Sequence, residues 1–257
     1  MSFWESVLVV LAGVGAGTIN TIVGSGSLIT FPILLLLGVP PVSANVSNNL
    51  GMLPGGIAGA YGYRRELRGR WGPLLKLLPW SVVGAAVGAA LLLVLPAEAF
   101  RKIVPILIGF GLLMVIFGPR LQRWSAAHHQ ETGAMPRWQA PALVVGLILA
   151  AMYGGYFGAA QGVILMGLLS TLAHGTLQEL NGWKNVLAST ANFVAAVVFV
   201  SAAPEQVDWG VAALIGVGSF IGGFIGAGVG RRLPPAILRA IIIAIGVVGI
   251  VKIIFFP

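Results

Sequence analysis

The chain has 257 residues, of which 58% are hydrophobic and only 9% charged, and its mean hydropathy is +0.97. Soluble domains carry about 25% charged residues, so this composition excludes an ordinary soluble domain and predicts an all-α, multi-pass membrane protein. The net charge of +8 does not indicate a nucleic-acid partner, because the basic residues stand in short loops between apolar runs, and the lack of cysteine excludes disulfides and thiol chemistry.

Ten apolar segments follow one another along the chain, five in each half. Eight are long enough for a membrane crossing, which takes about 20 residues. The other two, 27–37 and 162–173, occupy matching places in the two halves and could be short crossings or re-entrant half-helices. Short, glycine-interrupted segments at matching places are the sequence feature that best locates a transporter's binding site. The ten segments are 5–23, 27–37, 44–63, 74–95, 99–118, 141–160, 162–173, 182–200, 209–229 and 237–256.

The second half of the chain repeats the first. The stretch 45–49 (NVSNN) returns as 181–185 (NGWKN), at an offset of 136 residues, and Gly26 falls on Gly162 at the same offset. The repetition predicts two transmembrane repeats, each of about five segments. They span residues 1–118 and 141–257, with a cytoplasmic linker at 119–140 between them.

Loop charges indicate that the two repeats are inverted. The loop 64–70 holds four arginines against one glutamate and is predicted to be cytoplasmic, whereas its counterpart 201–208 holds only two acids and is predicted to lie outside. Both termini are then outside, and Arg101 with Lys102 is the one discordant pair near the outer face. Inverted repeats are typical of secondary transporters, whose substrate site lies where the repeats meet.

The linker 119–140 is predicted to be a solvated connector. His128 and His129 stand next to each other in it, but no further ligand follows at metal spacing. No metal and no cofactor is therefore predicted.

Glycine-rich breaks precede both short segments. Gly24-Ser25-Gly26-Ser27 lets the backbone leave the helix, and the next helix start offers unpaired N–H groups that favour an anion. The matching stretch 159–162, which contains Gln161 and Gly162, adds an amide side chain. A close-packing patch is the alternative, but the matched positions favour a substrate site.

Two stripes of polar side chains, one in each repeat, follow a spacing of i, i+3, i+4, which puts each stripe on one helix face. In inverted repeats the stripes can converge near the middle of the bilayer. Their alternative role is hydrogen bonding between helices, with the lysine reaching the cytoplasmic surface. The stripes are Asn45, Asn48 and Asn49 in the first repeat and Asn181, Lys184, Asn185 and Asn192 in the second, with Asn20 one turn before the first break.

Lys184 is the only basic residue in this predicted core. A membrane lysine is costly unless it faces protein, water or a counter-charge, and a lone cation among amide donors suits a small anion. Glu179 is the nearest acid in sequence and could pair with it. His174 could move protons, or could equally cap a helix or lie at the interface.

These motifs resemble the TauE/SafE family of membrane permeases, and the resemblance covers essentially the whole chain in both repeats. Members of the family are linked to sulfite, sulfoacetate, thiosulfate and other organosulfur anions. The resemblance implies a permease for such an anion. The matching stretches are 24–67, 154–169, 181–199 and 207–235.

The sequence thus predicts a secondary transporter, not an enzyme, that moves sulfite, an organosulfonate or a related anion across the cytoplasmic membrane by alternating access. Export is the expected direction, proton coupling and a homodimer are left open, and no ATP-binding loop is visible. One alternative is a passive anion channel. Another is a membrane-embedded hydrolase with Ser25 or Ser189 as nucleophile and Lys184 as base, although Ser189 lies about 140° round the helix from Lys184.

Overall fold

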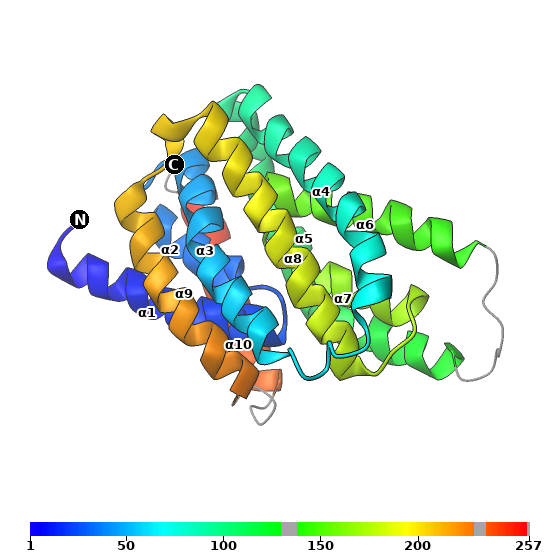
Figure 1. Ribbon diagram of the computed structural model, residues 1–257. Helices are drawn as coiled ribbons and strands as arrows, with labels where there is room; N and C mark the ends of the chain where they lie inside the picture. Colours follow the sequence, from blue (N-terminus) through cyan, green and yellow to red (C-terminus); the bar gives the residue numbers. More distant parts are fainter. Residues whose placement is uncertain (130–137, 229–234, 256–257) are drawn as a thin grey trace.

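The protein is all-helical, as predicted, in a computed structural model that describes residues 1–129, 138–228 and 235–255 (Figure 1). Within these ranges every regular element is a helix, and each predicted apolar segment corresponds to one of them, although the predicted segment 141–160 extends past the end of α6 at Tyr156, and residues 229 and 256 lie outside the described part of the chain. The elements are α1 (Phe3–Ile22), α2 (Ser27–Leu36), α3 (Pro41–Gly62), α4 (Trp71–Val94), α5 (Ala97–His129), α6 (Gln139–Tyr156), α7 (Gln161–Leu172), α8 (Leu177–Ala202), the 3₁₀-helix η1 (Pro204–Gln206), α9 (Trp209–Gly228) and α10 (Pro235–Phe255).

Six helices of the described chain are long and apolar enough to cross a membrane: α1, α4, the part Ala97–Gly118 of α5, α6, α8 and α9. The sequence predicted eight, and α3 is one of the two that do not qualify. It is 22 residues long but includes three asparagines, which lower its hydropathy. The six qualifying helices confirm the prediction of a multi-pass membrane protein.

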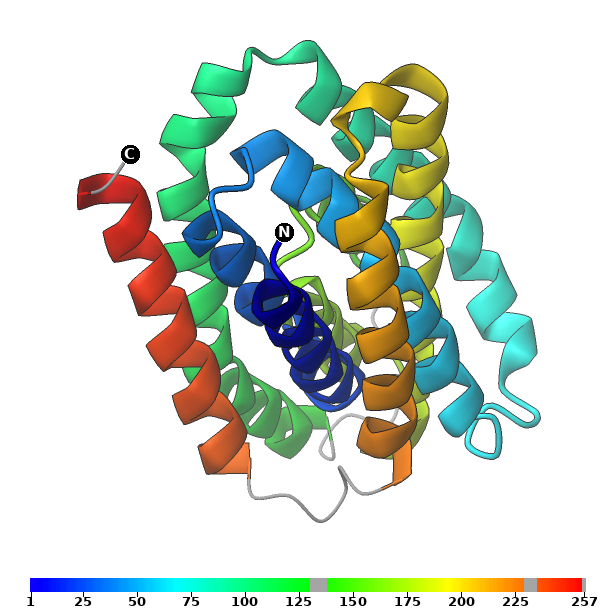
Figure 2. The same ribbon diagram turned by 90° about the vertical axis from the view of Figure 1, so that its left-hand side faces the viewer.

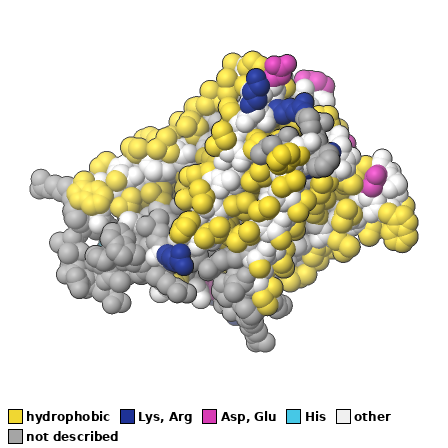
Figure 3. Space-filling view, turned by 180° about the vertical axis from the view of Figure 1, so that it is seen from behind, with side chains coloured by type: hydrophobic (Ala, Val, Ile, Leu, Met, Phe, Trp, Pro, Cys, Tyr) yellow, Lys and Arg dark blue, Asp and Glu magenta, His cyan; other side chains and the backbone are white. Residues whose placement is uncertain are grey.

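Hydrophobic side chains cover most of the described surface on the face seen in Figure 3, and charged side chains form only a few small groups there. Large apolar residues such as Trp4, Ile106 and Phe193 are more than half exposed. A soluble monomer rarely leaves so much contiguous apolar surface in water, whereas lipid chains cover it at no cost.

The fifth helix is longer than predicted. Its apolar part ends near Gly118, but α5 continues to His129, and α6 begins at Gln139. Residues 119–129, the first half of the predicted linker, are thus helical. After Pro119 this stretch has no glycine or proline that would end the helix. Residues 130–137 of the linker lie outside the described part of the chain.

The two short helices fold back along the helices that precede them. Gly26, just before α2, lies against the Ala16 carbonyl of α1. In the second half, Gly154 of α6 lies against Gln161, and Gly146 lies against Leu168, so α7 runs antiparallel to α6. Each pair is a helical hairpin whose turn is the glycine-containing break.

The helices α1, α3 and α9 pack side by side and run in one direction. Gly13 of α1 lies against Ile215 of α9 and Gly17 lies against Ser219, so the two helices run parallel. An added Cβ at Gly17 would stand 2.3 Å from the Ser219 carbonyl oxygen. Such close backbone approach explains the small residues along this interface.

The helices α6, α8 and α4 form a second group with the same internal arrangement. Gly84 of α4 lies against Ile148 of α6, and Gly88 lies against Met152, so these helices also run in parallel. The N-terminal ends of α1 and α6 extend toward opposite sides of the molecule in Figure 1. Each group thus takes its first and third helices from one half of the chain and its fourth from the other half.

The two groups meet at α3 and α8, which run antiparallel. Asn49 of α3 lies opposite Asn192 of α8, and Gly56 lies against Ser189. At the periphery, α10 lies beside α5 and α2 (Figure 2). Antiparallel groups are what inverted repeats require, and inversion across a bilayer stays a prediction, as do the repeat boundaries.

Candidate functional site

The two glycine-containing breaks cross each other in the interior. The Gly162 N–H donates a hydrogen bond to the Gly24 carbonyl at 3.0 Å, and a Cβ added to either glycine would stand 2.4 Å from the other's Cα. Gly24 has φ +88° and Ala160, its equivalent at the 136-residue offset, has φ +63°. Both breaks thus turn through the left-handed region at the same repeat position, which costs an alanine about 1–2 kcal/mol.

Two buried donors next to this crossing have no hydrogen-bond partner in the described part of the chain. Ser25 is 1% exposed and Gln161 is 2% exposed, and neither the Ser25 hydroxyl nor the Gln161 Nε2 bonds to any described residue. The two positions are equivalent, since 25 plus the offset of 136 gives 161. Leaving a buried polar group unsatisfied costs about 1–3 kcal/mol, so two of them at matched positions make this crossing a candidate ligand site.

The short helices α2 and α7 both begin at the crossing. Their positive N-terminal ends therefore converge there, which favours a negative charge. Fewer backbone N–H groups are available to a ligand than the sequence suggested. The Gly162 N–H donates to the Gly24 carbonyl, and the backbone N–H of Gln161 donates to the Gly158 carbonyl at 3.4 Å.

Lys184 is buried beside the first break, with 1% of its surface exposed. Its ammonium donates to the carbonyl oxygens of Asn20 at 3.3 Å and Thr21 at 3.0 Å, at the C-terminal end of α1. A cation is favourable there because the helix dipole is negative at that end. The alternative in which Lys184 reaches the surface is therefore wrong, and in this conformation its partners are carbonyls.

The amides of the second stripe converge on the same carbonyl. Asn185 Nδ2 lies 3.3 Å from the Thr21 oxygen, and Asn181 Nδ2 lies 3.5 Å from it and 2.6 Å from the Tyr63 hydroxyl. Sequence reasoning missed both acceptors. A backbone carbonyl has no signature in the sequence, and Tyr63 is the last residue of its predicted segment.

The amides of the first stripe, which share one face of α3, bond to three different neighbours. Asn45 Nδ2 donates to the Tyr156 carbonyl, at the C-terminal end of α6, at 2.9 Å. Asn48 donates to the Ser27 hydroxyl at 3.0 Å and accepts a bond from Thr30, so it binds the start of α2.

Asn49 is the third member of that stripe. Its Nδ2 lies 3.5 Å from Asn192 Oδ1, so the two stripes bond directly at this place. Its own Oδ1 is buried without a partner among the described residues. Asn20, by its Cβ, lies beside Gly26 and lines the first break.

The hydrolase alternative lacks its required geometry. The Ser189 hydroxyl donates to the Asn185 carbonyl one turn back in α8, at 2.7 Å, and the Lys184 ammonium points to α1. The Ser25 hydroxyl has no partner in the described chain. Neither serine is bonded to the proposed base.

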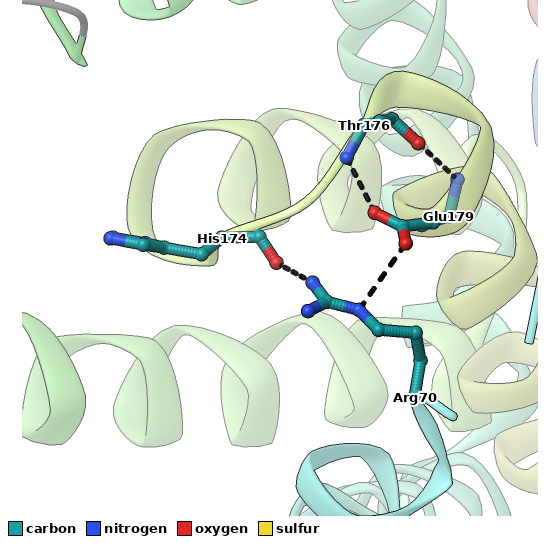
Figure 4. Close-up of polar contacts among 4 residues, drawn as sticks. All are labelled: Arg70, His174, Thr176 and Glu179. Carbon is teal, nitrogen blue, oxygen red and sulfur yellow. Dashed lines mark hydrogen bonds and ion pairs between the residues drawn. The ribbon is translucent and has the colours of Figure 1, made fainter. Parts of the chain in front are cut away.

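Glu179 does not pair with Lys184. Its Oε1 lies 3.5 Å from Nε of Arg70, and its Oε2 accepts from the Thr176 N–H at 2.7 Å (Figure 4). The Thr176 hydroxyl in turn accepts from the Glu179 N–H, which completes a capping box at the start of α8. The His174 backbone carbonyl accepts from Arg70 in the same cluster.

The six apolar helices define a polytopic membrane protein, and its crossed breaks and buried amides are the features expected of a transporter. The model of the sulfite exporter TauE/SafE family matches residues 9–253, and the chain belongs to this family. A "probable membrane transporter protein" of Haemophilus influenzae is 26% identical over 99% of this chain and 97% of its own length. The "probable membrane transporter protein YfcA" of Escherichia coli K12 is 25% identical over 93% of this chain and 86% of its own length. No solved structure matches the chain significantly.

Proposed function

We propose that the protein is a secondary transporter that exports a small oxyanion, such as sulfite or an organosulfonate, across the cytoplasmic membrane by alternating access, and that it has no enzymatic activity. The substrate site of this proposal is the crossing of the two breaks. The family description names sulfite exporters, and the chemistry of the crossing supports an anion independently of that description.

The observation that carries the proposal is the matched pair of donors for which the described residues supply no partner. The Ser25 hydroxyl and the Gln161 amide are buried at equivalent positions of the two breaks. An oxyanion has several strong acceptor oxygens and no N–H donor, so it satisfies both groups at once. The converging N-terminal ends of α2 and α7 add favourable electrostatics.

Lys184 supports the same site by its charge. Without it, the carbonyl end of α1 would present a partial negative charge immediately before the first break, and that charge would repel an anion. The ammonium offsets the partial negative charge of this helix end while it is bound to the Asn20 and Thr21 carbonyls. We infer that Lys184 makes the crossing electropositive, with or without direct contact to the substrate.

The crossing also suits alternating access, since the hydrogen bond between Gly24 and Gly162 joins one half of the chain to the other. A rocking movement of the two halves separates these glycines and exposes Ser25 and Gln161 to one side at a time.

The test measures sulfite and sulfonate binding and flux with purified protein, in detergent and in proteoliposomes. Ser25→Ala and Gln161→Leu each remove a hydrogen bond to a charged ligand, worth about 1.5–3 kcal/mol, so the dissociation constant is expected to rise about 10- to 100-fold. Without ligand the same variants are expected to be as stable as the parent or more stable, because each removes an unsatisfied buried donor.

Ser189→Ala is the matched control, since that hydroxyl donates to the Asn185 carbonyl of its own helix, and it is expected to leave affinity unchanged. Saturable flux favours a carrier over a channel, and an imposed pH gradient that drives uptake would establish proton coupling. Unchanged affinity in both site variants would refute the proposed site.

A further inference from the structure

Arg70 joins the two halves of the chain at one end of the α3–α8 pair. It lies in the turn between α3 and α4, and its Nε is 3.5 Å from Oε1 of Glu179 in the first turn of α8. Its guanidinium also donates to the His174 carbonyl (Figure 4) and lies 5.6 Å from the centre of the Trp183 ring. The Arg70 and Glu179 side chains are 31% and 26% exposed, so the ion pair is partly shielded from water.

A second contact joins the halves at the other end of the same helix pair. The Ser43 hydroxyl, in the first turn of α3, lies 3.3 Å from Oε1 of Gln206 in η1, which follows α8. Since α3 and α8 are antiparallel, the start of α3 lies by the end of α8, and the start of α8 lies by the end of α3. The two contacts are therefore at opposite ends.

The two contacts occupy corresponding places in the two halves. Ser43 and Glu179 are equivalent at the offset of 136, and Arg70 and Gln206 both lie in the turn between the third and fourth helices of their half. Each contact thus links the turn after the third helix of one half to the first turn of the third helix of the other half. The same place is occupied by an ion pair at one end and by a neutral hydrogen bond at the other.

We propose that these contacts are the two gates of the transport cycle, one holding each end of the crossing closed. This inference rests on the proposed function, since gates presuppose alternating access. Movement of one half against the other must break one contact while the other holds. Because the Arg70–Glu179 gate is ionic, its closure weakens with salt, whereas closure of the neutral Ser43–Gln206 gate does not.

The chain contains no cysteine, so a single Ser25→Cys substitution gives a reporter at the crossing without background. Its reaction with a membrane-impermeant thiol reagent is followed from each side of oriented vesicles. In this background Arg70→Gln is expected to raise labelling from the Arg70 end about two- to fivefold, the size expected for a partly exposed ion pair. Gln206→Ala is expected to raise labelling from the opposite end only.

Glu179→Gln removes the ion pair while keeping the helix start intact, because glutamine retains the capping box with Thr176 and loses only the charge. It is expected to raise labelling from the Arg70 end as Arg70→Gln does, and the double variant is expected to add nothing further. Arg68→Gln, an exposed arginine in the same turn, is the control and is expected to have no effect. Raising the salt concentration should mimic Arg70→Gln in the parent and have no effect in Glu179→Gln.

The gate proposal is overturned if Arg70→Gln and Glu179→Gln raise labelling equally from both sides, or if they leave labelling unchanged. A Ser43→Cys/Gln206→Cys pair gives a second test that does not use the reporter. Oxidation is expected to stop flux and reduction to restore it, and continued flux in the fully crosslinked protein overturns the gate at that end. Labelling needs no substrate, so side-specific labelling without any sulfite or sulfonate flux would retain the gates and reject the proposed substrate.

Discussion

The two breaks share a backbone geometry but differ in how the preceding helix ends. Gly24 and Ala160 turn through the left-handed region at equivalent positions. Before the first break, one carbonyl, that of Thr21, accepts from an ammonium and two amides. Before the second, the Tyr156 carbonyl accepts from the single amide of Asn45. The repeated geometry therefore sets where the breaks cross, and the unequal caps make one side of the crossing more positive.

The largest expected effect comes from forcing the breaks apart. Gly24→Ala places a methyl group 2.4 Å from the Cα of Gly162 and adds the left-handed penalty of about 1–2 kcal/mol. Gly162→Ala adds the collision alone. Both are expected to lower the thermal unfolding midpoint in detergent strongly, Gly24→Ala more so, because backbone on both sides of the contact leaves no flexible group to move aside.

Gly38→Ala is the matched control. Its φ of +80° carries the same conformational penalty, but an added Cβ has nothing within 4 Å. It is expected to lower stability by only about 1–2 kcal/mol. Equal losses in Gly38→Ala and Gly24→Ala would show that the crossing is not tightly packed.

A smaller effect is expected from removing a cap at each break. Asn45→Leu leaves the Tyr156 carbonyl without its side-chain donor and is expected to cost about 1–3 kcal/mol in the free energy of unfolding. Asn185→Leu is expected to cost less than Asn45→Leu, because the Thr21 carbonyl still accepts from Lys184 at 3.0 Å. Denaturant titration followed by tryptophan fluorescence measures both, and the reverse order would contradict the redundancy of the first cap.

The smallest effect is expected from making the second break resemble the first. Ala160→Gly relieves about 1–2 kcal/mol of left-handed strain. It also loses a buried methyl group worth about 0.8 kcal/mol and adds backbone freedom worth about 0.5–1 kcal/mol in the unfolded chain. The thermal midpoint is therefore expected to change little, and a large loss would show that the Ala160 methyl group packs a contact that Gly24 lacks.

The sequence predicted the elements of the site better than their partners. It located both breaks, because Gly24 and Gly26 mark the first break in the sequence itself and the repeat places Gly162 at the second. The polar stripes were also identified, since membrane asparagines stand out by composition. The Arg70–Glu179 pair and the Asn45–Tyr156 bond were not predicted, because each joins residues more than a hundred positions apart.

The sequence alone determined the class of the protein, the repetition of its halves and the position of its two breaks. These follow from apolar length, residue spacing and backbone freedom, which are properties of short stretches. Only the tertiary structure decided that the breaks touch at Gly24 and Gly162, that Lys184 caps α1, and that the Ser25 hydroxyl and the Gln161 Nε2 lack partners among the described residues. Hydrogen-bond satisfaction depends on which backbone groups a fold brings within about 3 Å, and distant helices supply those groups.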